Sequence, residues 1–189
     1  MSQVTRRGLV QASFSCALLA AAVSPLSLAP ALPPPMLPDP NWLAKLKLAR
    51  YIAKTFSRPM DLTYRIVDAS FRNALKAKLS PLLVLAVIAK ESSFTPTARS
   101  DYGAVGLMQV VPRMHEDLVA RIVEPEGLEH PESNIDTGTT ILAGYMRSKG
   151  GDVQATLRKY SGNARQYGER VLAYWQEFAQ VAYPGKQLA

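Results

Sequence analysis

Hydrophobic and polar residues alternate along most of this chain with the period of an α-helix. Residues 41–58 carry one apolar stripe, and five Lys and Arg residues lie mostly off it. Residues 64–79 are predicted to form a second helix. Residues 81–92 are apolar on nearly every side between Leu82 and Ala89. A helix that is apolar all round lies inside a domain, so this segment is predicted to be a buried helix.

Helix start and stop signals place the other elements. Ser80 and Pro81 suit the N-cap and first position of the buried helix, and a further helix is expected after the bend at Pro112. Three more are predicted at 134–150, 152–160 and 165–181, the first ending at a Gly-Gly pair and the second capped by Asp152. No period-two strand series and no internal repeat stands out. The sequence therefore predicts a mainly helical domain over residues 61–189, with a Gly-rich irregular segment between 95 and 111.

The first forty residues have a different character. Residues 1–31 contain no Asp or Glu, and Arg6 and Arg7 precede an Ala/Leu-rich stretch. This layout predicts a signal peptide, with paired arginines as in the twin-arginine type, cleaved before Leu32. The alternative is an uncleaved anchor, because the apolar stretch is nearly long enough to span a bilayer. Residues 32–40 contain five prolines and are predicted to form a stiff linker.

Composition and charge narrow the function only partly. The chain has 189 residues, 48% hydrophobic and 20% charged, which excludes a disordered tail. Its net charge of +7 favours an anionic environment without choosing among nucleic acid, membrane and cell wall. Residues 41–60 form a basic amphipathic helix, which either docks on the main domain through its apolar stripe or contacts a membrane surface or partner. The export signal argues against nucleic acid, and the single Cys16 cannot form an internal disulfide.

Candidate chemistry lies at the end of the buried helix, at Glu91. Its neighbours one turn back are Val87 and Ile88, and both this apolar surrounding and the negative end of the helix dipole disfavour a carboxylate. Both effects raise the pKa of Glu91. A carboxyl group that stays protonated near neutral pH suits glycosidic cleavage, because the leaving oxygen must receive a proton. The alternative is an ordinary helix-end glutamate paired with Lys90 or Arg99.

The residues around Glu91 resemble a known signature. Glu91-Ser92-Ser93-Phe94, followed by the run Gly-Ala-Val-Gly-Leu-Met-Gln-Val-Val-Pro at 103–112, resembles the lytic transglycosylases of the soluble (SLT) type. In the second half, Asn134-Ile135 with Gly138 and Leu142 resembles the Asn-initiated helix of the family. Tyr160-Ser161-Gly162-Asn163, followed by Tyr167 and Val171, resembles its tyrosine motif and closing helix, although the commoner form is Tyr-Asn-Ala-Gly. The implied fold is a lysozyme-like, goose-type helical domain with an irregular substrate-binding loop after the catalytic helix.

The resemblance also implies a reaction. The substrate would be the glycan strand of peptidoglycan, cut at the β-1,4 bond between N-acetylmuramic acid and N-acetylglucosamine. Glu91 would be the only catalytic carboxylate, first protonating the glycosidic oxygen and then deprotonating the muramyl C6 hydroxyl. Attack of that hydroxyl on the anomeric carbon would leave a 1,6-anhydro end, with the substrate's acetamido group assisting.

Other site residues carry over from the same motifs. Ser100 and Gln109 would bond the acetamido group or Glu91, and Tyr160 would donate its hydroxyl near the acid/base. Gly106 would make room for the sugar, and Met108 and Asn163 are further candidate substrate contacts. No cofactor is implied. No metal site is predicted either, since the segment that begins at His115 lacks the second histidine of a zinc-protease helix.

Two alternatives stay open at this point. A lysozyme-type hydrolase would use Asp101 to position water, although goose-type lysozymes carry an aspartate where this chain has Val111. A non-catalytic glycan-binding protein of a secretion assembly would keep the groove without turnover. The leading expectation is a periplasmic enzyme that opens the wall locally for an envelope-spanning secretion, conjugation or pilus machine.

Overall fold

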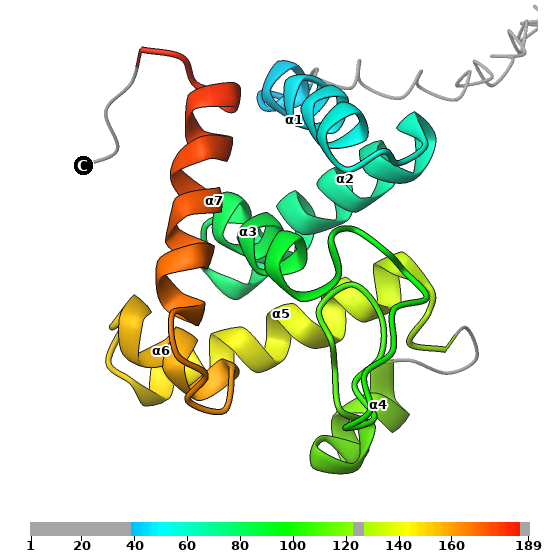
Figure 1. The fold of residues 1–189 in the computed structure, drawn as a ribbon, viewed down its shortest axis with the longest axis vertical. Helices are drawn as coiled ribbons and strands as arrows, with labels where there is room; N and C mark the ends of the chain where they lie inside the picture. The colour runs from blue at the N-terminus through cyan, green and yellow to red at the C-terminus, as the bar shows by residue number, and fades with distance from the viewer. Residues whose placement is uncertain (1–38, 123–126, 186–189) are drawn as a thin grey trace, which may run out of the picture. The chain divides into compact units, whose positions relative to one another are not determined.

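A computed structural model of the chain describes residues 39–122 and 127–185. The predicted signal peptide and nearly all of the Pro-rich linker lie outside the described residues. The described part is mainly helical, as the sequence predicts, and its β-structure is limited to two isolated bridges, Arg99–Val105 and Val105–Val110. The elements, drawn in Figure 1, are α1 (Trp42–Thr55), α2 (Met60–Ala77), α3 (Pro81–Ser92), η1 (Pro112–Met114), α4 (Glu116–Ile122), α5 (Pro131–Ser148), α6 (Val153–Tyr160) and α7 (Tyr167–Ala182).

Helix α3 forms the centre of the core. Every residue from Leu82 to Ala89 is buried, and α2 and α7 pack against it. Figure 1 shows α3 at the centre of the helices, beside α7. Just past the end of α3, the fully buried ring of Phe94 meets Phe56 and Phe178 edge-on, at centroid distances of 4.8 and 6.3 Å. The end of α3 is therefore fixed from several sides.

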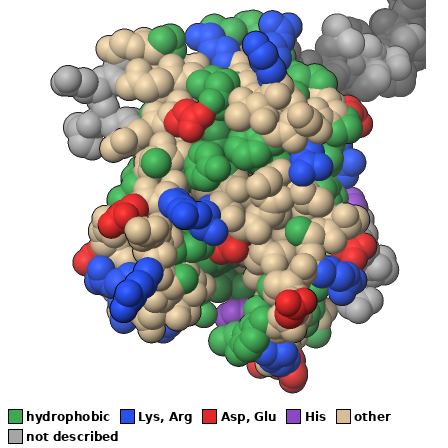
Figure 2. All heavy atoms as spheres, in the orientation of Figure 1, with side chains coloured by type: hydrophobic (Ala, Val, Ile, Leu, Met, Phe, Trp, Pro, Cys, Tyr) green, Lys and Arg blue, Asp and Glu red, His purple; other side chains and the backbone are tan. Residues whose placement is uncertain are grey.

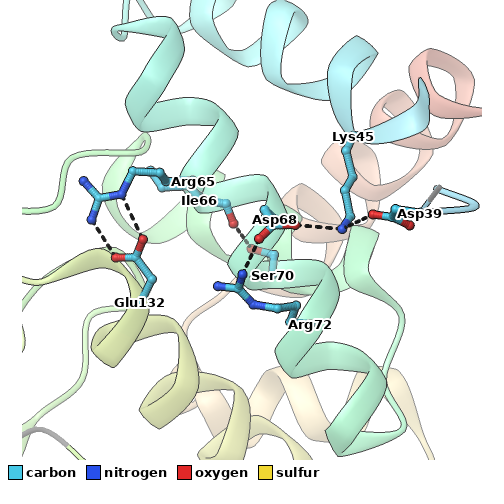
Figure 3. A network of polar contacts seen from close by, with 8 residues as sticks. All are labelled: Asp39, Lys45, Arg65, Ile66, Asp68, Ser70, Arg72 and Glu132. Carbon is cyan, nitrogen blue, oxygen red and sulfur yellow. Dashed lines mark hydrogen bonds and ion pairs between the residues drawn. The ribbon is translucent and has the colours of Figure 1, made fainter. Parts of the chain in front are cut away.

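Helix α1 belongs to the same core. Leu48, Ala49 and Ile52 are fully buried in it, so the apolar stripe docks on the domain and is not free for a membrane or partner. Lys45, on the same helix, is buried as well. Figure 3 shows its ammonium group bridging Asp39 at 2.5 Å and Asp68 at 2.8 Å. Trp42, the first residue of α1, is 52% exposed.

Two helices begin earlier than the sequence patterns indicate. Helix α2 starts at Met60, directly after Pro59, with Asp61 in its first turn, where a carboxylate favours the positive end of the helix. Helix α5 starts at Pro131, a residue that suits the first position of a helix. The predicted start of this helix at Asn134 is therefore wrong by one turn. Asn134 instead lies in the first turn, fully buried.

The segment between α3 and η1 is irregular, as predicted, but its backbone is closely bonded. Val105 and Val110 exchange two backbone hydrogen bonds at 2.8 and 3.0 Å, and the Gly106 amide donates to the Ala98 carbonyl at 2.8 Å. This fixed loop covers one side of the site described below. Within 39–122 and 127–185, none of the helices combines the length and hydropathy needed to cross a membrane.

Candidate active site

A cleft of about 580 Å³ opens beside the C-terminal end of α3. Its walls come from α3, the irregular loop, α5, α6 and the start of α7. Figure 2 shows acidic side-chain atoms in a recess of the face drawn, with Lys and Arg side chains beside it. Glu91 is the only carboxylate among the described lining residues. The lining residues are Lys90, Glu91, Ser100, Tyr102, Ala104, Gln109, Val110, Val111, Met114, His115, Ile141, Tyr145, Lys159, Tyr160, Ser161, Gly162, Ala164 and Tyr167.

Glu91 is held in an environment that disfavours its charge. Burial raises the pKa of its carboxyl group, and this effect outweighs the hydrogen bond from Tyr167 and the attraction of Lys90, which lower the pKa. The upward direction predicted from the apolar neighbours is therefore confirmed. Glu91 pairs neither with Lys90 nor with Arg99 in an ion pair of the described chain, and Arg99 binds Glu129 at 2.6 Å.

The hydroxyl that reaches Glu91 belongs to Tyr167, at the first position of α7. It donates to Glu91 Oε1 at 2.5 Å. Burial and the nearby Glu91 raise the pKa of Tyr167 far above its usual value, so the phenol stays protonated and remains a donor. In the sequence motifs, Tyr167 belongs only to the closing helix. Tyr167 lies at the start of that helix, seven residues after Tyr160. This position is the sequence feature that could have predicted a second tyrosine facing the site.

Tyr160 lines the cleft but has a different partner from the one expected. Its hydroxyl donates to the Met108 carbonyl at 2.8 Å, and the hydroxyl that bonds to Glu91 is that of Tyr167. Burial raises the pKa of Tyr160 well above its usual value, with the negative charge of Glu91 as a second cause. Tyr160 therefore joins α6 to the irregular loop and stands near Glu91 without bonding to it.

Ser100 and Gln109 both lie in the cleft with Glu91. The Ser100 hydroxyl accepts from the Ala104 amide at 3.1 Å. The Gln109 amide nitrogen donates to the carbonyls of Ala98 at 3.1 Å and Gly106 at 3.0 Å. These bonds stay within the loop, so neither side chain orients Glu91 directly in this structure.

The Asn134 side chain holds the irregular loop through three hydrogen bonds to backbone groups. Its Oδ1 accepts from the Met108 amide at 2.8 Å, and its Nδ2 donates to the carbonyls of Val105 at 2.9 Å and Leu128 at 2.8 Å. The Asn134 side chain that makes these three bonds is fully buried. Inside a protein such hydrogen bonds are stronger than in water, and losing one would leave a buried polar group unsatisfied. Asn134 is a positioning residue of the site that sequence reasoning noted only as a helix start.

Gly106 has a structural reason that differs from the expected one. Its φ is +79°, and a Cβ there would lie 2.5 Å from the Leu128 carbonyl oxygen and closer still to the Asn134 amide. Gly106 does not line the cleft. The space it leaves is thus filled by Asn134, and the expectation that it makes room for the sugar is corrected.

Met108 and Asn163 are also outside the cleft wall. The Met108 side chain is fully buried, and the lack of a Cβ at Gly138 makes room for it, since an added Cβ would lie 2.6 Å from the Met108 sulfur. Asn163 is exposed beyond the end of α6, and its amide donates to the Arg158 carbonyl at 2.8 Å. The Met108 side chain therefore belongs to the core, and Asn163 is an exposed residue between Gly162 and Ala164, which line the cleft.

No second carboxylate joins Glu91 in the described cleft wall. Asp101, the candidate for positioning water, is exposed on the loop and does not line the cleft, although its neighbour Tyr102 does. Among the described residues, no group of three or more His, Cys, Asp or Glu side chains is arranged to hold a metal ion. Glu91 is thus the buried carboxyl group in the described cleft wall that can transfer a proton.

The match to a protein family decides the identity of this fold. The model of the transglycosylase SLT domain matches residues 68–177, which include α3, the irregular loop and both tyrosines. The chain belongs to the transglycosylase SLT domain family. Within this SLT domain, Glu91, Gln109 and Tyr160 all fall inside the matched range.

Relatives and solved structures are similar to parts of the chain. Membrane-bound lytic murein transglycosylase C of Sodalis glossinidius is 43% identical over 86 residues, covering 42% of this chain and 24% of the relative. Its counterpart in Yersinia pestis is 36% identical over 97 residues, covering 48% of this chain and 27% of that protein. This chain thus spans about a quarter of the length of these curated relatives.

Two solved structures share the fold. An inactive mutant of the lytic transglycosylase Slt from Pseudomonas aeruginosa matches with a TM-score of 0.55 and 22% identity, covering 60% of this chain and 24% of the other. The 70 kDa soluble lytic transglycosylase of Escherichia coli matches with a TM-score of 0.53 and 22% identity, covering 70% of this chain and 29% of the other. These likenesses establish the lysozyme-like SLT fold predicted from the sequence.

Proposed function

We propose that this SLT domain is a peptidoglycan lytic transglycosylase with Glu91 as its single acid/base. The observation that carries the proposal is the isolation of Glu91 as the only described carboxylate in a cleft, with a pKa raised by burial. Family membership and relatives named lytic murein transglycosylase support the reaction class. A glycosidase with two catalytic carboxylates would need a partner that Asp101, outside the cleft wall, does not provide.

The first step needs Glu91 in its acid form. Because burial raises the pKa, a larger fraction of the group is protonated near neutral pH than an exposed glutamate would allow. Glu91 then donates its proton to the oxygen of the β-1,4 bond that follows N-acetylmuramic acid. As that bond breaks, the acetamido oxygen of the same muramyl residue bonds to the anomeric carbon. The Glu91 carboxylate is left beside the Tyr167 hydroxyl, whose hydrogen bond stabilises the new charge.

The second step uses the same group as a base. The Glu91 carboxylate accepts the proton of the muramyl C6 hydroxyl, and the C6 oxygen bonds to the anomeric carbon in place of the acetamido oxygen. The products are a chain with a free 4-hydroxyl on N-acetylglucosamine and a 1,6-anhydromuramyl end. No water is consumed, and Glu91 is again protonated at the end of the cycle.

The direct test is cleavage of purified peptidoglycan by the full chain, with the masses of released muropeptides recorded. Glu91→Gln should abolish release while keeping the fold, since the amide has the same shape but cannot donate the proton. Glu169→Gln, an exposed glutamate of α7 outside the cleft, is the matched control and should cleave normally. We expect products lighter by one water than hydrolysis gives.

Other outcomes point elsewhere. Hydrated products would support a lysozyme-type hydrolase, and binding without products would support a glycan-binding protein. Undiminished release by Glu91→Gln would overturn the role of Glu91.

The cellular setting is a separate proposal that rests on the sequence. The predicted signal peptide and cleavage before Leu32 favour the periplasm, and the proposed task is local opening of the wall for an envelope-spanning secretion, conjugation or pilus machine. Terminal sequencing of the protein recovered from periplasm should begin at Leu32. An intact Met1 in the membrane fraction would instead favour an anchor.

A further inference from the structure

The turn that follows Glu91 has a backbone conformation that its surroundings must hold. Helix α3 ends at Ser92, and the next two residues, Ser93 and Phe94, have positive φ angles of 49° and 60°. Residues other than glycine rarely adopt this left-handed conformation, and it persists where neighbouring groups fix it. Glu91 is the next-to-last residue of α3, so the contacts that hold this turn also hold the backbone from which Glu91 projects.

One of these contacts is apolar and joins the turn to α7. The fully buried ring of Phe94 meets the ring of Phe178 edge-on, with 6.3 Å between the centroids. Phe178 belongs to the helix whose first residue, Tyr167, donates to Glu91. The packing of Phe94 and the bond between Tyr167 and Glu91 therefore connect the same two helices.

The other contact is polar and comes from Arg58. Its Nε donates to the Ser93 carbonyl at 3.1 Å, and its Nη2 donates to the Thr95 hydroxyl at 2.7 Å. The guanidinium group thus bonds to the residue on each side of Phe94, and its rigid fork of donors suits two acceptors at fixed positions. A positive charge is also favourable here, because the C-terminal end of α3 is the negative end of the helix dipole.

The backbone of Arg58 is itself held in place between α1 and α2. Ser57 has a φ of 53°, and the Arg58 amide donates to the Ala53 carbonyl at 3.0 Å, as in a Schellman helix ending. Pro59 follows and restricts Arg58 to an extended backbone. Within 39–122 and 127–185, no carboxylate forms an ion pair with Arg58. Its described side-chain bonds both go to the turn after Glu91.

We infer that Arg58 is a positioning residue for Glu91. By holding residues 93–95, it keeps the Glu91 carboxyl group within reach of the Tyr167 hydroxyl. Arg58 lies before residues 68–177, which the family model matches, so a segment outside the matched domain contributes to the site. This inference rests on the proposed function and adds a residue to the machinery of the same site.

Loss of the Arg58 bonds should act on Glu91 in a specific way. Burial raises the pKa of Glu91, whereas the Tyr167 hydrogen bond and Lys90 lower it. Arg58 does not line the cleft, so a variant without the guanidinium group should raise this pKa by loosening the Tyr167 bond. The titratable groups that line the cleft with Glu91 are Lys90, Tyr102, His115, Tyr145, Lys159, Tyr160 and Tyr167.

The test is a set of pH–rate profiles of the full chain on soluble glycan strands. Arg58→Gln should lower kcat about tenfold with KM unchanged, because the acid/base is misplaced while the rest of the cleft is kept. Its alkaline limb should move to higher pH. Arg58→Lys keeps the charge but not the fork of donors, so it should recover part of the lost kcat. Arg50→Gln, an exposed arginine of α1 outside the cleft, should match the unmodified chain.

A second variant removes one acceptor of Arg58 and keeps the guanidinium group. Thr95→Val has nearly the same shape as threonine and should move the alkaline limb in the same direction by a smaller amount. Thr97→Val, an exposed threonine of the same loop, is the matched control and should leave the profile unchanged. In a Tyr167→Phe background, Arg58→Gln should cause no further shift of the limb, since the bond through which it acts is already absent.

The outcomes separate this inference from the proposed function. A lower rate with an unmoved limb in Arg58→Gln, or a further shift in the Tyr167→Phe background, would overturn the positioning role. If Arg58→Gln does not fold, an unmoved limb in Thr95→Val overturns it. If the unmodified chain cleaves no glycan, the proposed function fails, and the pKa of Glu91 is measured by carbon-13 NMR of its carboxyl group. A higher pKa in Arg58→Gln would then support the inference, and an equal pKa would overturn it.

Discussion

Tyr167 is the residue that controls the charge state of Glu91 most directly. Its hydroxyl donates to Glu91 at 2.5 Å and lowers the pKa of the carboxyl group against the larger effect of burial. Tyr167→Phe removes that bond, so the pKa of Glu91 should rise further. Because the acid form starts the reaction, the alkaline limb of kcat/KM should move to higher pH. The rate at the optimum should fall about tenfold, as the carboxylate formed in the first step loses its donor.

The measurement is a pH–rate profile on soluble glycan strands. Tyr64→Phe, an exposed tyrosine of α2, serves as the control and should reproduce the unmodified profile. A limb that stays in place or moves to lower pH in Tyr167→Phe would show that the bond does not govern the acid/base.

Gly106 allows the loop to close over Asn134. An alanine there would be strained at a φ of +79° and would clash with the Leu128 carbonyl and the Asn134 amide. Gly106→Ala should therefore lower the free energy of unfolding by about 3 kcal/mol, measured by urea denaturation. Gly127→Ala is a matched control, since Gly127 has a φ of +80° and nothing within 4 Å of the added Cβ. Equal losses in the two variants would contradict the proposed close approach.

At the scale of elements, the sequence patterns were most informative for helices that are buried or marked by Pro and Gly. The apolar run after Pro81 predicted α3 with its observed bounds, and Asp152 caps α6 through the Ala155 amide at 2.9 Å. The residue pattern within one helix does not predict which residues of different elements come into contact. The bond between Tyr167 and Glu91 joins residues 76 positions apart, and the burial of Met108 depends on Gly138 across the core.

The same limit explains why the sequence did not show which tyrosine bonds to Glu91. Their motif placed Tyr160 near the site, but which of two phenols reaches Glu91 depends on how α6 and α7 pack. In the structure the Tyr167 hydroxyl donates to Glu91, and the Tyr160 hydroxyl donates to the Met108 carbonyl of the loop.

Helix α1 lies before the residues matched by the family model, yet it completes the same core. Leu48→Ala should therefore lower the free energy of unfolding by about 3 kcal/mol, as for other buried leucines. Leu43→Ala, on the same helix but 47% exposed, should change it by less than about 0.5 kcal/mol. Urea denaturation of both variants is the measurement. A small effect of Leu48→Ala would indicate that α1 is a separable helix with a role of its own.

At the scale of the whole molecule, the fold brings residues next to the first described helix, α1, and at the start of the last, α7, to the end of α3. Arg58, just after α1, donates to the Ser93 carbonyl at 3.1 Å and to the Thr95 hydroxyl at 2.7 Å, directly beyond α3. Helix α7 supplies Tyr167 from the other side. The result is a desolvated carboxyl group in a cleft that is also lined by Lys90 and Lys159.

In the proposed mechanism the substrate's own hydroxyl, and not water, completes the reaction. Digestion of peptidoglycan by the full chain in water enriched in the heavy oxygen isotope, followed by mass analysis of the new glycan ends, tests this step. We expect anhydro ends that contain no heavy oxygen. Incorporation of heavy oxygen at the new anomeric carbon would show that water attacks there, and the proposed mechanism would then be wrong.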